Sequence, residues 1–272
     1  MISDREEATS EDSSSPQILE QQWIEVQDSL RRRLVAEDDF AWRLPTALSP
    51  AMAAPVKAGE EYLKYVGGVD VSYSKDDPSV ACAALVVLDL QTLEVVYVDY
   101  SVSDLRVPYV PGFLAFREAP ILLELLEKMK SDAHPYYPQL LMVDGNGLLH
   151  PRGFGLACHL GVLANLPTIG IGKNLHHVDG LTKYGVRQLL EAKESCSEDI
   201  VILTGNTGQT FGAAMRLAEG SLKPIFVSIG HRISLSTAIT VVKVACKYRV
   251  PEPIRQADIR SRDCLQKHLR LC

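Results

Sequence analysis

Three acidic side chains stand where the surrounding sequence favours burial. Asp70 lies in the apolar segment 66–72, Asp144 ends the apolar run 140–143, and Glu118 lies between them on a segment with helical character. Burying an unpaired carboxylate is costly, so each needs a cation or hydrogen-bond donors. If the strands that carry Asp70 and Asp144 are neighbours, the three carboxylates converge near one sheet edge. Clustered oxygen ligands of this kind suit Mg²⁺ or Mn²⁺.

Taken one at a time, the same acids have ordinary structural explanations. Asp144 and Gly145 form a common turn dipeptide. Asp70 can hydrogen-bond the nearby backbone, and Glu118 can pair with Arg117 or with a lysine. Only the inferred convergence favours metal ligation over these alternatives.

Other residues that could handle a nucleic acid lie close by in the chain. Tyr109 stands between Pro108 and Pro111, a stiff segment that can hold an aromatic ring outward as a wedge; alternatively, the ring packs back on the sheet. The glycines of residues 145–147 let the backbone approach a ligand closely. Lys173 ends an apolar strand, where it could meet a phosphate or remain a solvated charge.

Composition restricts the class of protein. Apolar residues make up 46% of the 272 residues, and no apolar run reaches the roughly 18 residues of a membrane span, so we expect a globular chain without membrane contact. Six cysteines without a C-x-x-C pair predict neither a zinc site nor a redox pair. The acidic N-terminus does not resemble a secretory signal, and we expect a cytoplasmic or nuclear protein.

The net charge of −6 at first argues against a nucleic-acid partner, but the charge is unevenly distributed. Residues 1–15 hold five acidic residues against Arg5. Residues 243–272 hold eight basic residues against three acidic ones, which is compatible with phosphate binding or simply with a solvated helix face.

The elements that must position these residues follow from hydrophobic periodicity and turn signals. Three consecutive strands joined by short turns precede alternating helices and strands, which predicts one α/β domain with a mixed sheet flanked by helices. We expect residues 1–15 to be a disordered acidic tail and residues 44–61 to be a linker. The expected strands are 65–73, 80–90, 93–100, 140–143, 168–172, 210–217 and 223–229, and the expected helices are 18–34, 113–130, 154–166, 234–247 and 255–271.

Several blocks of sequence together resemble the endonuclease V family. The proline-tyrosine-x-proline-glycine string that ends in Phe-Arg-Glu is especially specific, and the match runs from about residue 17 to the last helix. The blocks are residues 68–72, 108–118, 143–152, 167–173, 228–232 and 249–258. The resemblance implies an RNase H-like fold for residues 16–272. It also implies that Asp70, Glu118 and Asp144 hold one or two Mg²⁺ ions, for which Mn²⁺ substitutes.

The resemblance also implies how a nucleic acid is handled. Asp258 matches a fourth active-site position, which is Asp or His in the family and acts less directly, through water. Lys173 matches a lysine near the scissile phosphate, although it stands in Gly-Ile-Gly-Lys where many members have Gly-Val-Ala-Lys. Tyr109 matches the wedge that fills the gap left by a flipped inosine. The positions that match the hypoxanthine pocket are Gly112, Leu114, Gly145, His150 and Leu156.

The expected activity is therefore cleavage of inosine-containing single-stranded RNA, and of deoxyinosine-containing DNA, by a monomer. Members of the family cut the second phosphodiester bond 3′ to the inosine and leave 3′-hydroxyl and 5′-phosphate ends. The sequence looks closer to the animal members, which act on RNA, than to bacterial DNA-repair members. Two alternatives stay open: a deoxyinosine-specific DNA repair endonuclease, and an inosine-binding protein without catalysis.

Overall fold

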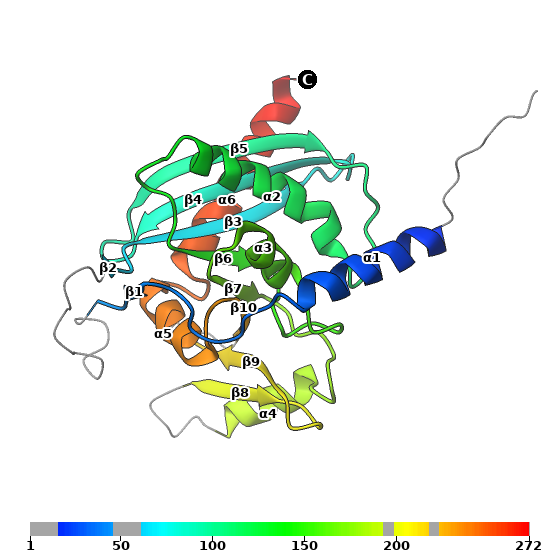
Figure 1. Cartoon of the computed structure of the whole chain (residues 1–272), viewed down its shortest axis with the longest axis vertical. Coiled ribbons are helices and arrows are strands. Elements are labelled where there is room, and N and C mark those ends of the chain that lie inside the picture. Colours follow the sequence, from blue (N-terminus) through cyan, green and yellow to red (C-terminus); the bar gives the residue numbers. More distant parts are fainter. Residues whose placement is uncertain (1–15, 46–60, 193–198, 218–222, 272) are drawn as a thin grey trace, which may run out of the picture.

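The computed structural model describes residues 16–45, 61–192, 199–217 and 223–271, which Figure 1 shows in colour. The expected tail at 1–15 and most of the expected linker at 44–61 lie outside these residues. At the borders of that segment, β1 (Trp42–Arg43) pairs in parallel with β2 (Glu61–Tyr62).

A mixed sheet of eight strands forms the centre of the described structure, in the order β5-β4-β3-β6-β7-β10-β9-β8. The pairs β3 with β6 and β6 with β7 are parallel, and the other neighbours are antiparallel. The strands are β3 (Tyr65–Tyr73), β4 (Val80–Asp89), β5 (Val95–Asp104), β6 (Leu140–Asp144), β7 (Thr168–Gly172), β8 (Ile200–Thr204), β9 (Thr210–Met215) and β10 (Ile225–His231).

Helices cover both faces of the sheet, which is why its central strands are apolar on both sides. In β6, Leu141 and Val143 face the apolar cluster that includes α2 and α3, whereas Leu140 and Met142 face the cluster that includes α5 and α6. Figure 1 shows α2 in front of β3 to β5 and α6 behind them. The helices are α1 (Pro16–Arg31), α2 (Leu114–Ser131), α3 (Leu156–Ala164), α4 (Lys183–Glu191), α5 (Leu235–Ala245) and α6 (Glu252–Leu271). None of the described helices is long and apolar enough to cross a membrane.

The expected elements are present, with four additions and some shifted ends. The short elements β1, β2, α4 and β8 were not predicted. The third predicted strand begins at Val95 rather than Leu93, because Leu93 has a positive φ of 56° in the preceding turn. The last helix begins at Glu252 rather than Arg255, since a proline fits the first turn of a helix, where its missing N–H is not needed.

Gly68 sets how closely α6 approaches the sheet. A Cβ atom on Gly68 would lie 2.2 Å from the carbonyl oxygen of Pro253, in the first turn of α6. Only glycine allows this approach, and α6 carries Asp258 toward β3. The distance between strand and helix therefore decides where Asp258 lies relative to Asp70.

We expect Gly68→Ala to destabilise the protein by roughly 1–3 kcal/mol and to reduce activity, because the added methyl group pushes α6 away from β3. Gly185→Ala is a matched control: it places alanine on the half-exposed helix α4, away from this contact. Chemical denaturation measures both variants. A Gly68→Ala protein as stable as the Gly185→Ala protein would contradict the proposed close contact.

Candidate active site

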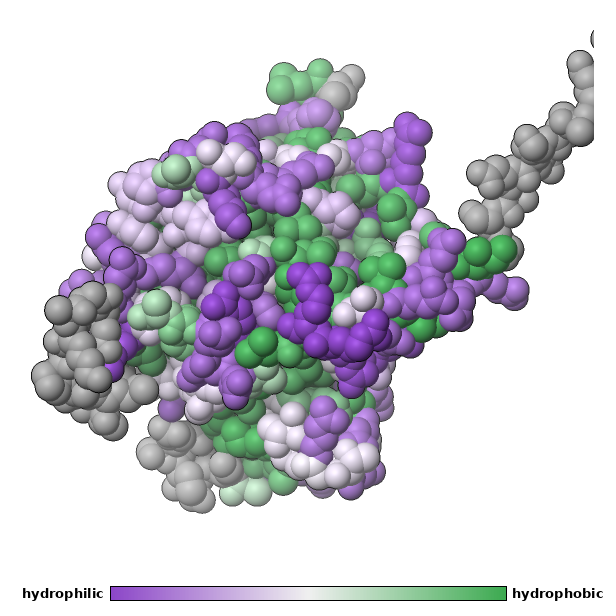
Figure 2. Space-filling model, in the orientation of Figure 1, coloured by the Kyte–Doolittle hydropathy of each residue, from purple (hydrophilic) through white to green (hydrophobic). Residues whose placement is uncertain are grey.

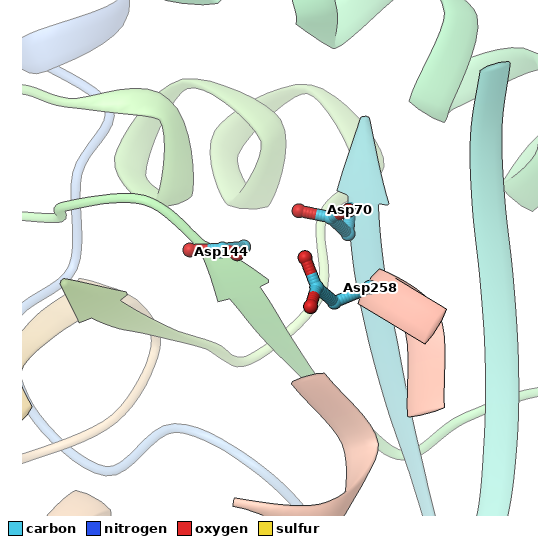
Figure 3. A group of neighbouring side chains, drawn as sticks. All are labelled: Asp70, Asp144 and Asp258. Carbon is cyan, nitrogen blue, oxygen red and sulfur yellow. The ribbon is translucent and has the colours of Figure 1, made fainter. Parts of the chain in front are cut away.

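Two of the predicted carboxylates come from neighbouring parallel strands, as their convergence required. Val69 on β3 is in register with Val143 on β6, so the next residue on each strand, Asp70 or Asp144, lies where the pairing of these two strands ends. Asp258 reaches the same place from α6 (Figure 3). The three residues each offer one carboxylate oxygen within 4.8 Å of the others.

Glu118 lies beside this cluster rather than within the group of three. Its buried carboxylate accepts a hydrogen bond of 2.8 Å from the hydroxyl of Tyr73, rather than from Arg117 or a lysine, the alternative partners that the sequence left open. The Arg117 guanidinium donates instead to the backbone carbonyls of Val107 and Pro78. The structure thus gives Asp258 a more central position than the sequence predicted, with Glu118 at the border.

The clustering makes ionisation of the carboxylates unfavourable. Burial, and then the nearby charge of Asp144, raise the pKa of Asp70 to about 7. Burial raises the pKa of Glu118 to about 8; the Tyr73 hydrogen bond opposes this rise, and the charges of Asp70 and Asp144 add to it. The site is therefore short of positive charge, which a bound cation would supply.

Lys173 contributes part of that positive charge. It follows β7, and its Nζ lies 2.6 Å from Asp144 Oδ2 and 3.7 Å from Asp258 Oδ1. Burial lowers the pKa of Lys173, but the nearby charges of Asp144, Asp258 and Asp70 outweigh burial and leave the pKa raised. The ammonium is thus charged and held among the carboxylates, rather than solvated at a strand end.

Ser261 is a site residue that the sequence reasoning missed. Its Oγ donates to Asp70 Oδ2 at 2.8 Å and lies 2.7 Å from the Oγ of Ser72. Because Ser261 follows Asp258 by three residues on a helix, both side chains face β3. The Asp-x-x-Ser spacing in the sequence could have indicated that Asp258 and Ser261 share one helix face. It does not identify Ser261 as a site residue unless the packing of that helix face on β3 is known.

The expected wedge points outward. Tyr109 is 62% exposed, so the alternative that its ring packs on the sheet does not hold. Gly112, two residues before Leu114 at the start of α2, has a φ of +88°, a conformation that favours glycine and turns the chain into the helix. Arg117 also stabilises the loop that contains Tyr109, because its guanidinium donates a hydrogen bond of 2.9 Å to the carbonyl oxygen of Val107.

The remaining pocket residues surround the start of α3. A Cβ atom on Gly145 would lie 3.3 Å from the side chain of Leu156, so the bare backbone is packed against that leucine. His150 is neutral near pH 7, because burial, and then the charge of His176, lower its pKa to about 4. Its Nδ1 accepts the backbone N–H of Arg152 at 3.2 Å, which leaves the proton on Nε2.

One buried amide joins the two loops that carry these residues. Gln27 on α1 donates to the carbonyl oxygens of Gly112, at 3.3 Å, and Phe154, at 2.8 Å, and accepts from the guanidinium of Arg152. Trp23, one helical turn earlier, stacks on Phe116 with the ring centroids 5.0 Å apart. The sequence indicated α1 but not this role, because a lone glutamine carries no signal.

Clustered carboxylates can hold divalent metal ions of the kind that nucleases use to cleave phosphodiester bonds. The family model for Endonuclease V matches residues 50–259. Endonuclease V of Mus musculus is 44% identical over 247 residues, covering 91% of this chain and 70% of the mouse protein. The chain therefore belongs to the endonuclease V family, a family of nucleases.

Solved structures agree with this membership and confirm the predicted fold. The catalytic domain of human Endonuclease V is 42% identical with a TM-score of 0.84, covering 95% of this chain and 100% of that domain. Endonuclease V of Ciona intestinalis is 35% identical with a TM-score of 0.80, covering 93% of this chain and 99% of the other. The latter was solved in complex with DNA that contains an inosine followed by a ribo-adenosine.

The raised pKa values predict how stability varies with pH. Between about pH 4.5 and about pH 8 the folded protein retains protons on Asp70 and Glu118 that the unfolded chain has lost. Without added metal, we expect the free energy of unfolding to fall by several kcal/mol as the pH rises through this range, because one unit of pKa shift corresponds to about 1.4 kcal/mol. Mg²⁺ should restore stability more at pH 8 than at pH 5.5.

Thermal unfolding with a chelator and with Mg²⁺ measures both effects. Asp70→Asn is the control variant, and it should flatten the pH dependence and weaken the response to Mg²⁺. A wild-type melting temperature that rises through this pH range in chelator would show that the carboxylates are not held in this environment.

Proposed function

We propose that this chain is a Mg²⁺-dependent endonuclease that cuts single-stranded RNA at the second phosphodiester bond 3′ to an inosine. It leaves 3′-hydroxyl and 5′-phosphate ends and also accepts deoxyinosine-containing DNA. The observation that supports this most is the cluster of Asp70, Asp144 and Asp258 with Lys173 among them. A family of nucleases and a site short of positive charge together favour metal-assisted hydrolysis over simple binding.

The donor set fits a hard divalent cation. Asp70, Asp144 and Asp258 would hold it through carboxylate oxygens, which Mg²⁺ and Mn²⁺ prefer, and Glu118 would be a further acceptor at the border. When bound, the cation supplies the charge that polarises a phosphoryl oxygen and activates water for attack. The Lys173 ammonium offsets the negative charge that grows on the phosphoryl oxygens.

Recognition of inosine is assigned to the backbone and to a neutral histidine. The Nε2–H of His150 can donate to the acceptor O6 of hypoxanthine, whereas adenine has an exocyclic amine, a donor, at that position. We assign exclusion of the 2-amino group of guanine to the backbone at Gly145, where an added Cβ atom would lie 3.3 Å from Leu156. Tyr109 fills the space that the flipped base leaves in the stack.

A ribonucleotide next to the inosine supports RNA as the preferred substrate. In the Ciona intestinalis complexes a ribo-adenosine follows the inosine, and a 2′-hydroxyl is the group by which proteins tell RNA from DNA. The strands in those complexes are otherwise DNA, which favours deoxyinosine-specific DNA cleavage as the second candidate function. An inosine-binding protein without catalysis would have no need for every acidic residue and the lysine of the site.

Cleavage of matched single strands tests the main proposal. RNA and DNA strands with one inosine each are incubated with Mg²⁺, with and without chelator; we expect RNA to be cut faster and chelator to stop both reactions. Asp70→Asn should abolish cleavage but bind the strand as wild type does, because it removes a charge of the cluster and keeps the side-chain shape. A fully active Asp70→Asn protein would refute the metal site. Faster cleavage of the DNA strand would reverse the order of the two candidate functions.

The exposed aromatic ring gives a separate prediction. Tyr109→Ala should weaken binding of an inosine strand roughly tenfold, because stacking of one base on an aromatic side chain contributes on the order of 1–3 kcal/mol. Tyr109→Phe keeps the ring and should bind like wild type. Fluorescence anisotropy in chelator measures affinity without cleavage. Equal affinities for the alanine and phenylalanine variants would remove the wedge from the proposed mechanism.

A further inference from the structure

A cavity of about 540 Å³ lies between the end of β7, helix α4, and the start of β10. Its walls combine cationic side chains with an apolar floor. The sequence reasoning did not indicate it, because α4 was not predicted. The lining residues that carry the argument are Lys173, Lys183, Val186, Arg187, Leu190 and Phe226.

Lys173 belongs to both the cavity and the acidic cluster. Its side chain lines the cavity, and its Nζ lies 2.6 Å from Asp144 Oδ2. If the scissile phosphate of a nucleic-acid strand lies at the carboxylates, this cavity is therefore directly beside the bond that is cleaved. The location suits a nucleotide of the same strand.

The charge of the walls favours an anion. Six cationic side chains line the cavity against one carboxylate, Glu191, in a chain whose net charge is −6. Arg249 has a structural role here, since its guanidinium donates to the carbonyls of Lys173, Lys223 and Pro224 and so joins β7 to β10.

Two exposed cations on α4 are available at the rim. Lys183 begins the helix, and Arg187 lies one turn further along, so both project from the same side. Arg187 pairs with Glu191 at 2.6 Å; both side chains are exposed, and surface pairs of this kind contribute little free energy. A phosphate can therefore replace the Glu191 carboxylate as the partner of Arg187 at a small cost in free energy.

The floor of the cavity is apolar. Val186 and Leu190 are buried on the inner side of α4 and pack with Phe226 of β10. A nucleotide carries the two features that these walls match: a charged phosphate for the rim and a flat, largely apolar base or sugar for the floor.

We infer that this cavity binds a nucleotide of the substrate strand next to the scissile phosphate, with the phosphate against Lys183 and Arg187. The inference rests on the proposed function, because it takes the acidic cluster as the place of cleavage. It assigns to α4 a role in holding the strand, separate from recognition of the inosine.

The double variant Lys183→Ala/Arg187→Ala tests the inference. On a long inosine RNA we expect KM to rise about tenfold with kcat within twofold of wild type. The salt dependence of binding should weaken by a slope of about 0.7, the value for one lost phosphate contact on a single strand. Lys183→Arg/Arg187→Lys keeps both charges and should behave like wild type. Lys130→Ala is the control at the far end of α2, roughly 18 Å along the helix from Glu118.

Shortened substrates separate a local contact from a general charge effect. Strands cut back on one flank of the cleavage site at a time should include one on which wild type and the double alanine variant bind equally, because the contacted nucleotide is missing. Equal affinity of both proteins for the long strand would overturn the inference, as would an equal loss on every shortened strand. Binding is measured in chelator, so the result stands even if wild type cleaves no inosine strand, which would refute the proposed function alone.

Discussion

The carboxylates of Asp70, Asp144 and Asp258 repel one another at short range in a partly buried site, and the surrounding structure keeps them together. The parallel pairing of β3 with β6 fixes two of them at one sheet edge. The close approach of α6 to Gly68 brings the third. The hydroxyl of Ser261 and the ammonium of Lys173 offset part of the charge. A site assembled against repulsion in this way is prepared for a cation before the substrate arrives.

The loops beside the cluster depend on a helix outside the segment that the family model matches. The match to the family model begins at residue 50, whereas Gln27 and Trp23 lie on α1. Gln27 hydrogen-bonds Gly112 and Arg152, and the ring of Trp23 packs against Phe113, so both side chains support these loops. Figure 2 shows one face of the molecule, on which hydrophilic and apolar residues are interspersed.

Much of the fold could be predicted because its central strands are apolar on both sides. The bounds of β3 and β7 were predicted to the residue, since turn residues and glycines delimit both. Helix α4 was missed because it is short and only Val186 and Leu190 of its residues are buried. The positions of Asp258 and Glu118 within the site could not be ranked, since their order depends on how α6 and α2 pack and not on the local sequence.

The contact between Ser261 and Asp70 joins residues 191 positions apart in the chain. Asp258 and Ser261 belong to α6, which follows every other helix and strand of the described structure. During synthesis on the ribosome, a nascent chain therefore exposes Asp70 and Asp144 long before α6 emerges. Until then the carboxylate cluster is incomplete, because Asp258 has not been synthesised. The order of the elements thus delays assembly of the carboxylate cluster until α6 has been synthesised.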